Sequence, residues 1–160
     1  MALKKPLVIT NGQVQQIQAG DTLDASCNKV DVIACTNNNA GSIVIGSPVY
    51  PDAAGSVDLA KADAAATVEV LGLVKDVSIT AAASGNIQTD GVLAATTGQW
   101  DAVTGDVGGL TAGSVYYLDP DTAGMLTTTG PTTTGDFVVR VGIGLSTTEL
   151  EISIMPPIKL

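Results

Sequence analysis

The stretch Gly46-Ser47-Pro48-Val49-Tyr50 returns later in the chain as Gly113-Ser114-Val115-Tyr116-Tyr117. A turn that contains one glycine follows each copy, and then comes a β-branched run that a glycine interrupts, Val68–Leu73 in the first copy and Val138–Ile143 in the second. Short runs of this composition between glycine-containing turns predict β-strands. The repeat predicts an internal duplication: either two similar β-lobes, at about residues 42–80 and 109–150, or one barrel built from a duplicated unit. The alternative is coincidence between two glycine-rich β segments.

The strand pattern extends outward from this repeat over nearly the whole chain. Leu7–Thr10 and Gln13–Gln18 flank Asn11-Gly12, a pair typical of two-residue hairpin turns, because both central residues adopt a positive φ. The other expected strands are Val30–Cys35, Ser42–Ile45, Val49–Tyr50, Thr67–Val74, Gly91–Ala94, Ser114–Leu118, Met125–Thr128, Phe137–Leu145 and Glu149–Ile154. One short helical turn near Leu59–Ala66 is the most helix that the sequence predicts. The predicted fold class is therefore all-β, a small β-barrel or β-sandwich with glycine-rich turns and little helix.

Length and charge limit the domain organisation and the partners. A chain of 160 residues fits one domain, which we divide into an N-terminal arm, residues 1–6, and a single β domain, residues 7–160. Acidic residues outnumber basic ones 16 to 7, so the net charge is −9. Nucleic acid is an improbable partner, since its binding requires a basic surface. The sequence has no apolar run of about 18 residues, and we expect no membrane partner.

The sequence offers little for catalysis or metal binding. It contains no histidine, which is the commonest acid–base group and metal ligand. Carboxylates occur close together in Asp119-Pro120-Asp121, in Asp101 with Asp106, and in Glu149 with Glu151. The first two groups lie in turn contexts, where an Asp side chain caps its own turn, and the glutamates alternate along a strand. We considered a calcium loop at Asp119–Gly124, but the final Glu of such loops is missing. We predict no catalytic residues, no metal site and no cofactor, so the protein is not expected to be an enzyme.

Two further pairs of residues give structural expectations. Cys27 and Cys35 are too few for a disulfide framework, and we expect two free thiols; the alternative is a disulfide between neighbouring strands. Tyr116 and Tyr117 are adjacent in an expected strand, so one ring faces inward and the other outward. An outward tyrosine is either an interface residue or a solvated edge residue, and we take Tyr116 and Tyr117 as interface candidates.

Two segments resemble a known family. Pro6–Leu23 and Gly109–Asp119, the latter followed by Gly142–Glu149, resemble the capsid decoration (cement) proteins and head-fibre proteins of tailed bacteriophages. The resemblance implies an all-β module, commonly a homotrimer, that binds the major capsid protein on the outside of the shell, stabilises it and carries no catalytic residues. It also implies a protein of the virion surface that is assembled in the bacterial cytoplasm. The alternative is a head- or tail-fibre adhesion module that binds a host-surface glycan, although the sequence contains no long shaft.

The N-terminal arm supplies the expected capsid contact. Leu3, Lys4 and Lys5 form a short cationic and partly apolar stretch on an otherwise acidic protein. Such a stretch can bind an acidic capsid surface, for example by adding a strand to an exposed sheet edge. The alternative is a disordered terminus whose lysines aid solubility.

Overall fold

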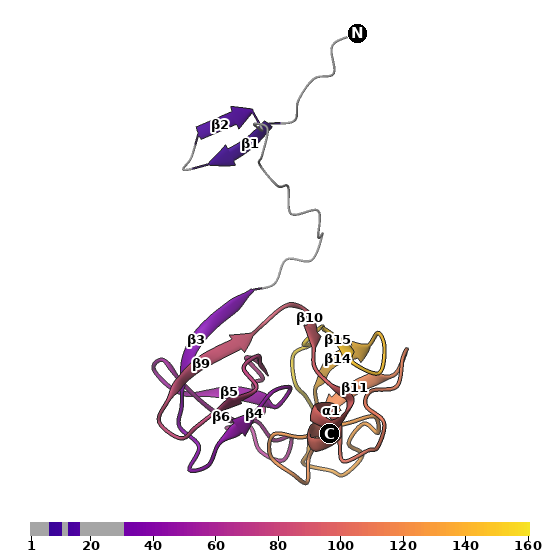
Figure 1. Cartoon of the computed structure of the whole chain (residues 1–160). Helices are drawn as coiled ribbons and strands as arrows, with labels where there is room; N and C mark the ends of the chain where they lie inside the picture. Colours follow the sequence, from indigo (N-terminus) through magenta and orange to yellow (C-terminus); the bar gives the residue numbers. More distant parts are fainter. Residues whose placement is uncertain (1–6, 11–12, 17–30) are drawn as a thin grey trace.

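The protein is an all-β molecule, as the strand pattern predicts. The computed structural model describes residues 7–10, 13–16 and 31–160 (Figure 1). In this part of the chain, α1 (Thr97–Thr104) is the one helix, and strands form the rest of the regular structure. The predicted N-terminal hairpin is present: β1 (Leu7–Thr10) and β2 (Gln13–Gln16) are antiparallel, and Thr10 pairs with Gln13 across a two-residue turn.

The first half of the molecule is a closed five-stranded barrel. Its strand order is β3-β6-β5-β7-β9, and the parallel pairing of β3 with β6 closes it. The strands are β3 (Val32–Asn37), β5 (Pro48–Ala53), β6 (Ser56–Leu59), β7 (Gly72–Val74) and β9 (Ser84–Gln88). Strands β4 (Ile43–Val44) and β8 (Ser78–Ile79) form a separate two-stranded antiparallel ribbon.

The second half is a five-stranded antiparallel sheet of order β10-β15-β14-β11-β12. Its strands are β10 (Gly91–Ala94), β11 (Val115–Leu118), β12 (Leu126–Thr127), β14 (Arg140–Gly144) and β15 (Glu149–Ile152). The chain ends in a ribbon in which β16 (Ile158–Lys159) pairs with β13 (Phe137–Val138).

The two halves share the same strand order. Read outward from β6, the barrel order β6-β5-β7-β9-β3 corresponds strand for strand to β12-β11-β14-β15-β10. Val49 pairs with Gly72 in the barrel, and Tyr116 pairs with Gly142 in the second sheet. These are the positions at which the two sequence copies align, so the repeat in the sequence corresponds to a repeat in the structure. The division into an arm and a domain stays a prediction, since the arm lies outside the described residues.

The turn before β5 and the turn before β11 are also alike. Gly46 and Gly113 have positive φ values of 84° and 80°, where glycine is favoured. The Gly46 N–H donates to the Val74 carbonyl at 2.9 Å, and the Gly113 N–H donates to the Gly144 carbonyl at 2.7 Å. These bonds tie the turn before β5 to β7 and the turn before β11 to β14.

The helix lies where the second half departs from the first. β3 continues to Asn37 and pairs with β6, whereas its counterpart β10 ends at Ala94 and the chain turns into α1, which contacts β12. Thr96 and Gln99 form a capping box at the helix start, and Gly105 ends the helix in the left-handed conformation. In the barrel, β6 is therefore paired with β3, whereas its counterpart β12 in the second sheet is contacted by α1.

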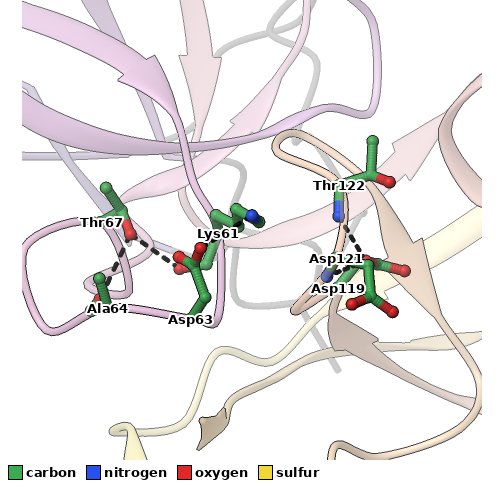
Figure 2. Close-up of polar contacts among 7 residues, drawn as sticks. All are labelled: Lys61, Asp63, Ala64, Thr67, Asp119, Asp121 and Thr122. Carbon is green, nitrogen blue, oxygen red and sulfur yellow. Dashed lines mark hydrogen bonds and ion pairs between the residues drawn. The ribbon is translucent and has the colours of Figure 1, made fainter.

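The helical turn predicted near Leu59–Ala66 is wrong. These residues form a strand end followed by consecutive turns, because Thr67 captures the backbone groups that a helix would use. Its hydroxyl donates to the carbonyls of Lys61 at 3.0 Å and Ala64 at 3.2 Å, as Figure 2 shows, and its carbonyl accepts from the Lys61 N–H. Local side-chain to backbone bonds of this kind compete with helix formation.

One hydrophobic core joins the two halves, which lie side by side in Figure 1. It contains Ala60 and Leu73 from the first half and Trp100 and Leu118 from the second. The Trp100 indole N–H donates to the Thr148 carbonyl at 3.0 Å. A smaller cluster fills the barrel itself, and both clusters consist mainly of aliphatic side chains.

Candidate docking groove

The two interface candidates lie on opposite faces of β11, as alternation along a strand predicts. Tyr116 is 1% exposed, and its hydroxyl accepts a hydrogen bond from the Thr111 N–H at 2.8 Å. Tyr117 is half-buried and lines a surface groove. Of the pair, Tyr117 is thus the residue that is available to a partner.

The groove around Tyr117, called the Tyr117 groove below, is a hollow of about 280 Å³. Strand pairing builds its floor, because Tyr117 pairs with Arg140 and Val138 pairs with Ile158. Its lining is apolar except for one guanidinium and one phenol group, and consists of Val115, Tyr117, Val138, Arg140, Met155, Pro156 and Ile158. Met155 and Ile158 are exposed. Exposed apolar surface that is grouped in this way is typical of sites that contact another molecule.

Arg140 gives the groove a positive charge that has no ion-pair partner within the described part of the chain. Its Nε is buried and has no hydrogen-bond partner within the described residues. No carboxylate is among the residues that line the groove. A buried guanidinium N–H without an acceptor costs free energy. The half-buried Arg140 side chain lines the groove, and by turning toward a carboxylate in the groove it would gain that acceptor. The groove is therefore chemically suited to an apolar group that carries a negative charge.

A second hollow, of about 230 Å³, is polar. It lies beside the β11–β12 turn, and its lining consists of Asp119, Pro120, Asp121, Thr127, Thr129, Gly130, Pro131, Thr132, Thr133 and Asp136. Asp119 Oδ1 accepts hydrogen bonds from the N–H groups of Asp121 at 2.7 Å and Thr122 at 2.8 Å, which Figure 2 shows. The prediction that Asp119 caps its own turn is confirmed.

The loop next to this turn carries an ion pair. Lys61 Nζ lies 2.8 Å from the Asp63 carboxylate. The hydrogen bond that Lys61 donates to the Asp63 carboxylate raises the pKa of Lys61, desolvation lowers it, and the negative charges of Asp63, Asp121 and Asp119 raise it further. The surface around the turn is thus acidic, and the negative charges of Asp63, Asp119 and Asp121 all act on Lys61.

The other carboxylate pairs do not face each other across a site. Asp101 Oδ1 accepts a hydrogen bond from the Gly109 N–H at 2.6 Å, while Asp106 is exposed in the following loop. Glu149 and Glu151 both lie on the exposed face of β15. Within residues 31–160, no group of three or more His, Cys, Asp or Glu side chains could hold a metal ion.

Some predicted residues lie outside the described part of the chain. Leu3, Lys4 and Lys5 belong there, and so does Cys27. Cys35 is a buried free cysteine. Burial raises the pKa of its thiol.

Sequence reasoning found Tyr117 but missed the groove. Its walls come from segments that are distant along the chain, and β16 completes it by pairing with β13. One signal was available: Arg140 is a lone cation inside the apolar run Phe137–Ile143, where a solvated charge is not expected.

No family model matches the chain, and no curated protein matches it. Among the described residues, no helix is long and apolar enough to cross a membrane.

Proposed function

We propose that this protein is a structural component of a bacteriophage virion, which binds the outer surface of the major capsid protein and stabilises the shell. The observation that carries the proposal is the Tyr117 groove, an apolar surface with one unpaired cation. Such a surface suits contact with another protein better than it suits catalysis. The groove thus supports a protein that works in an assembly, and the resemblance described above selects the capsid as that assembly.

Charge and core composition support a role in an assembly. A net charge of −9 opposes binding to the packaged DNA. Large aromatic side chains are scarce, and the core consists mainly of aliphatic side chains and alanine. Such a core buries little apolar area per residue, and burial against further copies would add stability. We therefore propose a homotrimer without enzymatic activity.

The direct test uses purified capsids that lack decoration protein. Titration of the protein onto such capsids should give saturable binding, and cryo-electron microscopy should then show density for three copies around local threefold positions. Decorated capsids should also withstand higher temperature than bare ones. An unrelated acidic all-β protein of similar size is the control. Absence of binding to expanded capsids would contradict the proposal.

A second function, adhesion to a host-surface glycan, draws support from the polar hollow. Threonine hydroxyls and Asp carboxylates line a volume of about 230 Å³, and both groups hydrogen-bond well to sugar hydroxyls. A glycan array probed with the intact protein tests this function. Specific binding that Asp136→Asn abolishes and that the exposed control Glu69→Gln leaves unchanged would favour adhesion over decoration.

A further inference from the structure

The loop that follows α1 presents an apolar tip beside a free carboxylate. Val107 is 97% exposed, the highest value among the large hydrophobic residues of the described part. Asp106 next to it is exposed, and its carboxylate makes no hydrogen bond or ion pair within residues 31–160. The Val107 side chain therefore contributes almost no apolar burial to the fold of its own molecule.

This loop is held in a fixed shape. Asp101 binds both of its ends: the backbone carbonyl accepts from the Gly105 N–H at 2.9 Å, and the carboxylate accepts from the Gly109 N–H at 2.6 Å. Gly105, Gly108 and Gly109 all have positive φ, so the turns around Val107 depend on glycine. A loop that is already ordered loses little conformational entropy on binding.

The loop and the Tyr117 groove are complementary in chemistry. The groove offers an apolar lining and an Arg140 Nε without an acceptor, and the loop offers an apolar side chain and a carboxylate without a donor. The loop does not enter the groove of its own molecule, because Val107 is almost fully exposed. We propose that the Asp106-Val107 loop of one copy inserts into the Tyr117 groove of a second copy, with the Asp106 carboxylate on the Arg140 guanidinium.

A contact between two different surfaces of identical chains is head-to-tail, and it forms a ring when the rotation per copy closes. This inference rests on the homotrimer of the proposed function and names the contact that would build it. It also explains how copies with a net charge of −9 associate, since an ion pair in an apolar groove opposes their general repulsion.

A second acid–valine pair, Asp76-Val77, fits the groove less well. Val77 is 69% exposed, but the Asp76 carboxylate already accepts hydrogen bonds from the Asn86 N–H at 2.8 Å and from the Asn86 side chain. These bonds already hold the Asp76 carboxylate and would compete with Arg140 for it. Val77→Asn is therefore a matched control for Val107→Asn.

The test measures the mass of the full chain in solution by analytical ultracentrifugation at 0.15 M salt. The unchanged protein should form a closed ring of 16.0 kDa subunits. Asp106→Lys and Arg140→Glu should each raise the dissociation constant about thirtyfold or more, because each places like charges in the contact. Val107→Asn should also weaken association, whereas Glu69→Lys and Val77→Asn should not.

Two combinations separate this contact from any other. The double variant Asp106→Arg with Arg140→Asp should restore the ring. An equimolar mixture of the Asp106→Lys and Arg140→Glu proteins should associate where neither protein does alone, because every contact between unlike copies then joins opposite charges: the intact loop meets the intact groove, and the reversed loop meets the reversed groove. Circular dichroism checks that Arg140→Glu is folded, and Asp106→Lys lies on an exposed loop where folding is not at risk.

A monomer at every concentration would overturn the inference, and so would a ring that Asp106→Lys and Val107→Asn leave intact. Neither result depends on capsids. If the rings form as described and yet do not bind decoration-free capsids, the proposed function fails while the loop-in-groove contact stands.

Discussion

Gly72 and Gly142 occupy equivalent positions in the two halves of the molecule, and neither leaves room for a side chain. A β-carbon on Gly72 would overlap the Gln88 carbonyl oxygen of the neighbouring strand β9. A β-carbon on Gly142 would overlap the Glu151 carbonyl oxygen of β15, which is the counterpart of β9. Both glycines thus permit the same close approach between neighbouring strands, β7 and β9 in the first half and β14 and β15 in the second.

We expect Gly72→Ala and Gly142→Ala to destabilise the protein by similar amounts, about 1–3 kcal/mol each, because the backbone that they would contact cannot move aside without strain. Chemical denaturation followed by circular dichroism measures both.

Gly98→Ala is the matched control. Gly98 lies within α1, and nothing stands within 4 Å of the place where its β-carbon would be. Alanine there should stabilise the protein by about 0.5–1 kcal/mol through helix propensity. A neutral Gly72→Ala beside a damaging Gly142→Ala would contradict the equivalence of the two positions.

Most of the duplicated strands were predictable because their signals are local: β-branched runs bounded by turn glycines specify strands without reference to the rest of the chain. Strands β6 and β9 were not predicted, because each contains only one β-branched residue, Val57 in β6 and Ile87 in β9. The aligned glycines Gly72 and Gly142 could be recognised for the same reason, since a close approach between strands constrains a single residue.

The helix and the groove were harder to predict for different reasons. The capping box of Thr96 and Gln99 with Gly105 was readable as a helix signal, but the helix between them has only eight residues and a weak apolar pattern. The Tyr117 groove depends on how β13, β14 and β16 come together, and no local pattern specifies such a tertiary arrangement. The β3–β6 pair that closes the barrel and the contact of α1 with β12 also depend on tertiary contacts between distant segments.

Trp100 should be the residue on which the joint stability of the two halves most depends. It is fully buried, and a β-carbon on Gly46 of the first half would lie only 2.8 Å from its ring. Trp100→Ala should cost about 3–5 kcal/mol, with Trp100→Phe costing less. Because it is the chain's one tryptophan, its fluorescence in the unchanged protein reports on the contact between the halves. Fluorescence and circular dichroism should show coincident unfolding; a separate early fluorescence transition would mean that the halves unfold independently.

The Cys35 thiol should be unreactive in the folded protein. Burial holds its pKa above the ordinary value of 9.0, so the reactive thiolate is scarce and the sulfur is covered. Iodoacetamide at pH 8 should modify Cys35 only at the rate of unfolding, as peptide mass spectrometry would show. Denatured, non-reduced protein should give two titratable thiols, Cys27 included, whereas a count of zero would indicate a disulfide.

The same shift predicts a pH dependence of stability. As the pH rises above 9.0, the thiol of the unfolded chain loses its proton before that of the folded chain. Below pH 9.0, Cys35 should therefore make its full contribution to the free energy of unfolding. This contribution should be lost as the pH rises through the higher pKa of the folded state. Cys35→Ala removes this contribution, so the difference in unfolding free energy between the two proteins should change only in the alkaline range. A difference that is constant from pH 7 to pH 10.5 would contradict the shift.

The N-terminal arm should contribute to capsid binding and not to the fold. Lys4 and Lys5 supply two of the seven positive charges of the chain, and the body described by residues 31–160 builds its core without them. Deletion of Met1–Lys5 should leave the circular dichroism spectrum and the number of subunits in the oligomer unchanged, but it should weaken binding to decoration-free capsids. Lys4→Glu combined with Lys5→Glu should have the same effect, and the loss should shrink at high salt, because the Debye length is only about 10 Å at 0.1 M. Lys75→Glu is the control for a charge change on the β body. If the truncated protein decorates capsids with unchanged affinity, the capsid contact lies on the β body.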